Sequence, residues 1–173
     1  MAEVCWSSRL RVGTATVSLG MFLLACALTA GHGHGGFLED GVDPVGWQLL
    51  VFGWMAGPLS PLVCLAWIAN PLWVLSLVVL WRRGYRAALL SSGSAGALSL
   101  IPLAMLGWGS FPELRWESPV ALVFSGGRLE LRLGYFIWVG SQMVLFAGAS
   151  LLWLGSRRAA PGLLQAASVN PPL

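Results

Sequence analysis

His32 and His34 stand one residue apart in the Gly-rich stretch GHGHGG, and they are the only histidines in the chain. A short His-rich tract can bind Zn or Cu. The pair supplies two of the four ligands that a closed zinc site needs, and the sequence places no third ligand beside it. We therefore interpret the stretch as a solvated loop and keep a metal site at His32 and His34 as an alternative.

Asn70 and Pro71 are the most informative polar residues in the apolar part of the sequence, because the run from Trp47 to Trp81 contains no charge. Proline removes one backbone donor and frees a carbonyl one turn earlier, and in lipid a neighbouring helix or side chain must satisfy such groups. We interpret Asn70 as an amide that joins the helix to a neighbour. As an alternative, Asn70, Gln142 and the breaks at Pro58 and Pro71 line a path through the membrane.

Groups that would support other chemistry are missing from the sequence. There is no Ser/His/Asp set, phosphate loop or dinucleotide fingerprint, and the scattered Cys5, Cys26 and Cys64 form no metal or disulfide pattern. Apart from arginines at the ends of apolar runs, no carboxylate, Arg or His falls inside a predicted span, which argues against active transport. We predict a protein that is not an enzyme, has no cofactor and binds no nucleic acid.

The composition indicates an integral membrane protein, since 57% of the residues are hydrophobic and only 10% are charged, against roughly 25% charged in soluble domains. The apolar residues come in long runs, which predict an all-α fold with four transmembrane helices over about 12–30, 59–81, 87–108 and 135–154. These form one domain, 1–158, followed by a disordered tail, 159–173.

Two smaller elements are expected between the spans. The run from Trp47 to Trp81 would measure about 52 Å as one helix, against a hydrocarbon core of roughly 30 Å. We therefore predict an interfacial or re-entrant half-helix over 44–56 before the second span. Between the third and fourth spans, Val120–Phe124 and Arg128–Leu133 flank a Gly turn and predict a small outer β-hairpin.

Arginine placement predicts the orientation of the chain. One group of loops and ends carries Arg9, Arg11, Arg82, Arg83, Arg86, Arg157 and Arg158 with the single acid Glu3; the other group carries Arg115, Arg128 and Arg132 with the remaining acids. This bias predicts that both termini lie in the cytoplasm. We expect a multi-pass protein of a bacterial inner membrane. A first span processed after Ala30, as a signal peptide, or at Cys26, as a lipoprotein, is the alternative to a retained one.

Small residues in the third span predict close helix packing. Ser92 with Gly96, and Gly93 with Ala97, have the small-xxx-small spacing that lets two helix backbones approach.

The segments Gly46–Trp47, Gly53–Trp54 and Trp67-x-Ala69–Asn70–Pro71, followed by RRGYRAAL and by Gly134–Tyr135 with Trp138, resemble a group of small uncharacterised bacterial inner-membrane proteins. The resemblance covers residues 44–154. It implies a four-helix membrane protein and carries over no catalytic residues.

The function expected from the sequence is that of a non-catalytic accessory or structural subunit, which contacts the lipid bilayer and packs against other membrane proteins in a larger complex. The alternative is a passive channel or small-molecule carrier whose path passes the Asn70–Pro71 break.

Overall fold

The computed structural model describes residues 2–33, 45–56, 61–104 and 129–169. Its long helices are α1 (Ala2–Ala27), α3 (Pro61–Trp81), α4 (Tyr85–Ser99) and α7 (Leu133–Val169). Four segments of the described chain are long and apolar enough to cross a membrane: Trp6–Ala27, Cys64–Trp81, Tyr85–Ala104 and Leu133–Arg157. The predicted set of four spanning helices is therefore confirmed.

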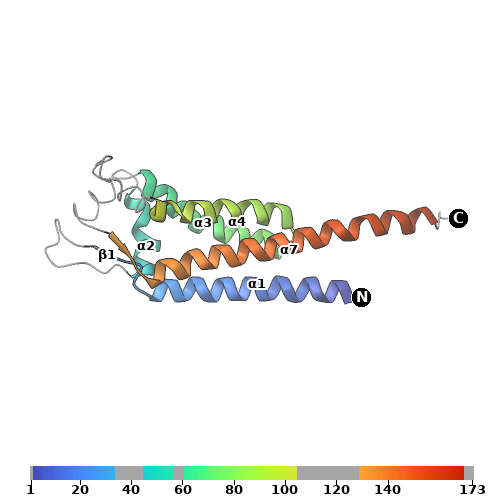
Figure 1. Cartoon of the computed structure of the whole chain (residues 1–173), viewed down its shortest axis with the longest axis horizontal. Helices are drawn as coiled ribbons and strands as arrows, with labels where there is room; N and C mark the ends of the chain where they lie inside the picture. Colours follow the sequence, from blue (N-terminus) through green and yellow to red (C-terminus); the bar gives the residue numbers. More distant parts are fainter. Residues whose placement is uncertain (1, 34–44, 57–60, 105–128, 170–173) are drawn as a thin grey trace.

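The helices lie side by side in an elongated bundle in which α1 begins and α7 ends at the same end (Figure 1). Glycines on α7 and α4 let neighbouring helices approach closely. Thr14 of α1 packs on Gly148, while the side chains of Met143 and Phe146 on α7 lie against Gly96 and Gly93 of α4. α4 therefore packs on α7 at Gly93 and Gly96. Of the other two predicted small residues, Ser92 is buried and Ala97 is exposed.

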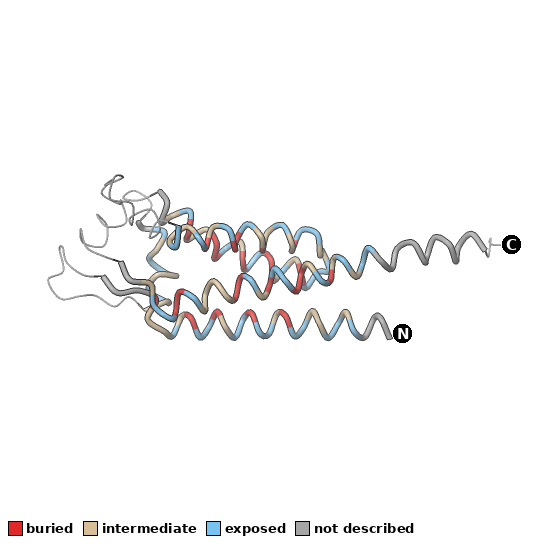
Figure 2. Tube along the Cα trace, viewed as in Figure 1, coloured by how far each residue is buried: buried red, intermediate tan, exposed pale blue. Residues whose placement is uncertain are grey.

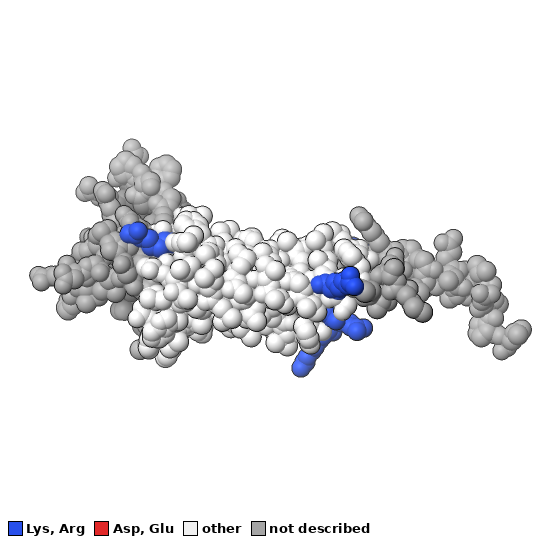
Figure 3. All heavy atoms as spheres, turned by 90° about the horizontal axis from the view of Figure 1, so that it is seen from below, with Lys and Arg blue, Asp and Glu red and all other residues white. Residues whose placement is uncertain are grey.

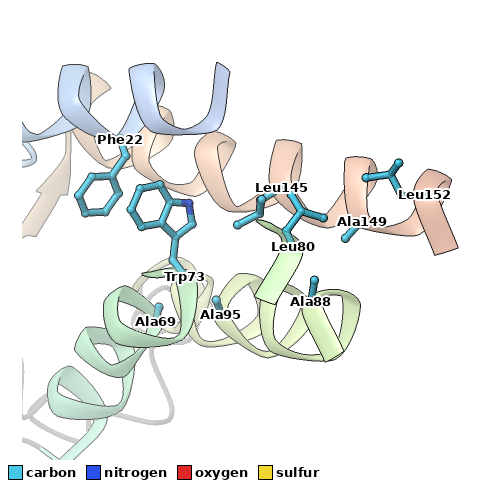
Figure 4. Close-up of a cluster of buried hydrophobic side chains, with 9 residues drawn as sticks. All are labelled: Phe22, Ala69, Trp73, Leu80, Ala88, Ala95, Leu145, Ala149 and Leu152. Carbon is cyan, nitrogen blue, oxygen red and sulfur yellow. The ribbon is translucent and has the colours of Figure 1, made fainter. Parts of the chain in front are cut away.

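The core lies along the facing sides of the helices, which Figure 2 shows in red against pale blue outer faces. Toward one end of the buried cluster, Phe22 of α1 stacks on Trp73 of α3, with ring centroids 4.1 Å apart (Figure 4). Leu80, Leu145 and Ala149 continue the core toward the end where the chain begins. The outer faces are apolar as well, as expected for helices that contact lipid.

α3 ends in a Schellman motif. The Gly84 amide donates to the Val79 carbonyl at 3.0 Å, and the Arg83 amide donates to the Leu80 carbonyl at 3.1 Å. Arg83 has φ 65°, the left-handed conformation that glycine usually supplies at this position. The motif produces a tight turn directly into α4.

The opposite end of the bundle carries the short elements. α2 (Gly46–Phe52) and the 3₁₀ helix η1 (Gly53–Ala56) occupy the stretch where a half-helix was expected. The Gly46 amide donates to the Leu28 carbonyl at 2.9 Å, and the Trp67 indole donates to the Leu50 carbonyl at 2.8 Å. These bonds attach α2 to the end of α1 and to α3.

The predicted β-hairpin is not supported. β2 (Leu129–Leu131) lies in its second expected strand but pairs antiparallel with β1 (Gly31–Gly33), with Glu130 opposite His32. The other expected strand, 120–124, lies outside the described residues. The pairing continues as hydrogen bonds from the Arg132 and Gly134 amides to the carbonyls of residues 30 and 29, so the ribbon aligns the start of α7 with the end of α1.

α7 extends beyond the predicted span. It remains helical to Val169 and thus includes residues 159–169 of the tail that was expected to be disordered. This segment contains four Ala and two Leu, which are strong helix formers, but also Pro161 and Gly162, which disfavour a helix.

We expect Gly148→Val to destabilise the protein, because the new side chain would occupy the space that Thr14 of α1 fills. Overpacking of this kind costs about 1–3 kcal/mol. The matched control is Gly20→Val, since nothing lies within 4 Å of the position that a Cβ would take at Gly20. Thermal unfolding of the purified protein in detergent measures both, and equal midpoints would contradict the α1–α7 packing.

Candidate functional site

A relay of hydrogen bonds joins three helices in the middle of the bundle. The Trp73 indole of α3 donates to the Ser18 hydroxyl of α1 at 2.9 Å, and that hydroxyl donates to the Ser141 carbonyl of α7 at 2.8 Å. Trp73, Ser18 and Ser141 are buried. Because water is absent from a bilayer core, each of these groups depends on the others for its partner.

A second contact joins α3 to α7 one turn away. The Trp138 indole donates to Asn70 Oδ1 at 2.8 Å, and Asn70 is buried. Pro71, the next residue, lies inside α3 and is exposed. Asn70 therefore makes the interhelical contact expected of an amide that joins this helix to a neighbour. Pro58, the other expected break, lies outside the described residues.

Gln142 lies on α7 one turn after Trp138 and next to Ser141, and it is fully buried. Neither Nε2 nor Oε1 of its side chain has a hydrogen-bond partner. An unpaired buried amide costs about 1–3 kcal/mol. Among the described residues, the only other buried side-chain atom without a partner is Arg11 Nε, so Gln142 is the one fully buried side chain whose polar end the fold leaves unmatched.

The remaining interior polar groups serve the packing of α4. The Tyr135 hydroxyl of α7 donates to the Ser99 carbonyl at 2.7 Å, and the hydroxyls of Ser76 and Ser91 bond at 2.7 Å between α3 and α4. The buried polar side chains in the described residues are alcohols and amides together with the Tyr135 phenol and the Trp73 indole, and none of them is Asp, Glu, His, Lys or Arg. Such side chains can bond to a neutral polar molecule.

The two histidines are placed only in part. His32 belongs to β1, where the strand register sets it opposite Glu130, and His34 lies outside the described residues. Within the described residues, no three side chains of His, Cys, Asp or Glu come together as metal ligands would.

Sequence reasoning missed Ser18, Trp73 and Ser141, and noted Trp138 only as part of a short pattern. A lone serine or tryptophan in an apolar run looks like packing, because its partner lies far away in the chain. One feature of the sequence could have pointed to these residues. A buried indole N–H needs a hydrogen-bond acceptor, and an apolar span contains few side chains that can accept one.

No protein-family model, curated protein or solved structure matches this chain.

We expect opposite effects on stability from the two buried amides. Gln142→Met removes an unpaired polar group while retaining the side chain's length, and it should raise the free energy of unfolding by about 1 kcal/mol. Asn70→Leu leaves the Trp138 indole without its acceptor, and it should lower that free energy by about 1–3 kcal/mol. Thermal unfolding in detergent measures both. A lower stability of Gln142→Met would show that the amide has a partner in the folded protein.

Proposed function

We propose that this protein is a non-catalytic subunit of a larger membrane complex, in which it packs against other membrane proteins. The proposal is supported chiefly by the outward face of α1. Gly13 and Gly20 are seven residues apart on that face, and nothing lies within 4 Å of the position that a Cβ would take at either. Thr16, between them, is also exposed.

Four glycines inside the long helices provide a comparison for Gly13 and Gly20. Gly93, Gly96, Gly140 and Gly148 each lie against a side chain of a neighbouring helix of this chain. Glycine inside a helix costs about 1 kcal/mol relative to alanine, and at those four positions close packing offsets the cost. At Gly13 and Gly20 this chain supplies no such packing. A helix from a partner protein, seated on the small face, would supply it.

The proposed setting is the inner membrane of a bacterium, with both termini in the cytoplasm. The arginines near the start of α1, in the α3–α4 turn and at Arg157 gather at one end, and such an excess marks the cytoplasmic side. The β1–β2 ribbon and α2 then face the outside. Trp47, Phe52 and Trp54 are exposed on α2 and η1, which suits a half-helix lying in the outer interface.

We expect the native complex to depend on the small face of α1. The protein, extracted from native membranes in mild detergent, should run on a native gel at a mass well above its own 18.4 kDa plus detergent. The double variant Gly13→Leu/Gly20→Leu should lose the larger mass while its unfolding midpoint stays the same or rises, because the added side chains enter open space and leucine favours the helix more than glycine does.

The matched control is Ala97→Leu/Ala147→Leu, which enlarges two exposed small residues on α4 and α7. It should retain the complex. Migration of the wild-type protein as a single chain would contradict the proposal. An unaltered complex in the glycine variant would show that the partner does not bind at Gly13 and Gly20 of α1.

A passive channel or small-molecule carrier is the second candidate, and the unpaired amide of Gln142 favours it. A polar solute passing through the bundle would bond to that amide in transit. Proteoliposomes should then show a flux of a small neutral solute such as glycerol that Gln142→Met lowers at least tenfold. Flux no faster than that of protein-free liposomes would exclude this candidate, and would leave the subunit proposal intact.

A further inference from the structure

Six arginines from three separate segments gather at one end of the bundle. Arg11 approaches Trp81 at the end of α3, and Gly155, two residues before Arg157, lies beside Trp6 of α1, so the three segments meet there. Arginine side chains are visible near this end in Figure 3. The six are Arg9, Arg11, Arg82, Arg83, Arg86 and Arg157, and no acidic side chain is among those that the structure describes at this end.

Two of these arginines lie over tryptophan rings. The guanidinium carbon of Arg11 is 5.8 Å from the centroid of Trp81, and that of Arg157 is 4.2 Å from the ring of Trp153. An indole covers the face of a guanidinium and leaves its edge, where the N–H donors are, free for a bidentate partner. Arg11 Nε is buried with no hydrogen-bond acceptor. A phosphate outside the bundle could therefore bond to Arg11 only through the terminal Nη donors of its guanidinium.

Arg83 adds an independent observation. It occupies the left-handed C′ position of the Schellman motif, where glycine avoids roughly 1 kcal/mol of strain. The arginine is exposed, so packing within this chain does not explain its presence. A ligand for its guanidinium would.

We propose that this end binds the phosphate headgroup of an anionic phospholipid in the leaflet that surrounds it. Phosphate is the partner that matches bidentate guanidinium donors. Tryptophans at the ends of spans lie at headgroup depth, and Trp81 is 62% exposed beside the arginines. A lipid phosphate is already present at that depth, whereas free phosphate would have to enter from water. The inference depends on the four spans being in a membrane and is independent of the proposed complex.

The test is a titration of the purified full-length chain in neutral detergent with phosphatidylglycerol, with phosphatidylcholine of the same acyl chains as the reference. Native mass spectrometry counts the lipids bound. We expect tighter binding of phosphatidylglycerol, and about a fivefold loss of affinity for each arginine removed, since one arginine near an anionic surface contributes about 1 kcal/mol.

Arg83→Gly is the most informative variant. It removes a guanidinium while relieving backbone strain, so it should unfold at the same or a higher temperature and still bind the lipid about fivefold more weakly. Arg11→Gln should weaken binding similarly. Arg11→Lys should not restore it, because an ammonium keeps the charge and lacks the planar fork.

The matched control is Arg132→Gln, at the opposite end of the bundle beside β2, which should bind phosphatidylglycerol as the wild type does. An equal loss in that control, or equal binding of the two lipids by the wild type, would overturn the proposal. Displacement of the lipid by millimolar inorganic phosphate would identify the ligand as a free anion and would likewise overturn it. Unchanged affinity in both Arg83→Gly and Arg11→Gln would do the same.

Discussion

The structure depends on one constraint: a polar group between helices in a bilayer has no water to bond with, so each must find its partner in another helix. The relay from Trp73 through Ser18 to the Ser141 carbonyl meets this constraint for α3, α1 and α7 at once. It also fixes the position of α1. Where Phe22 stacks on Trp73, the same tryptophan carries both the apolar and the polar link between α1 and α3.

The two ends of the bundle differ in the groups that hold and surround the helix ends. At one end, backbone hydrogen bonds between β1 and β2 and between Gly46 and Leu28 align the helices where loops enter and leave. At the other, a single turn joins α3 to α4, and the exposed groups are arginines and tryptophans. Backbone hydrogen bonds between strands thus organise the first end, whereas the second end exposes guanidinium groups.

Hydropathy predicted the four long helices because a bilayer imposes a minimum length on any span, and that length is a property of local sequence. Hydropathy could not predict the hydrogen bonds between helices in the interior. Asn70 was recognised as a polar group in need of a neighbour, but its partner Trp138 is distant in the chain and indistinguishable from other tryptophans. Likewise Leu129–Leu131 has the alternation of a strand, yet alternation does not name the strand that pairs with it. The nearby Gly turn favoured a local hairpin, and the structure instead pairs β2 with Gly31–Gly33, whose two glycines carry no strand signal.

The distribution of unmatched groups is the basis on which we propose where this protein contacts other molecules. In the described interior every buried polar side chain is neutral, and all but Gln142 have partners within the chain or are small alcohols. A protein that moved ions or protons would need charge at that depth. The features that the fold leaves without a counterpart lie mainly on its outside: the open glycines of α1, and the arginines around Trp81. Gln142 is the exception in the interior. An unpaired buried amide lowers the stability of the protein. A polar molecule that bonded to Gln142 inside the bundle would remove this cost, and its binding would be favourable for that reason.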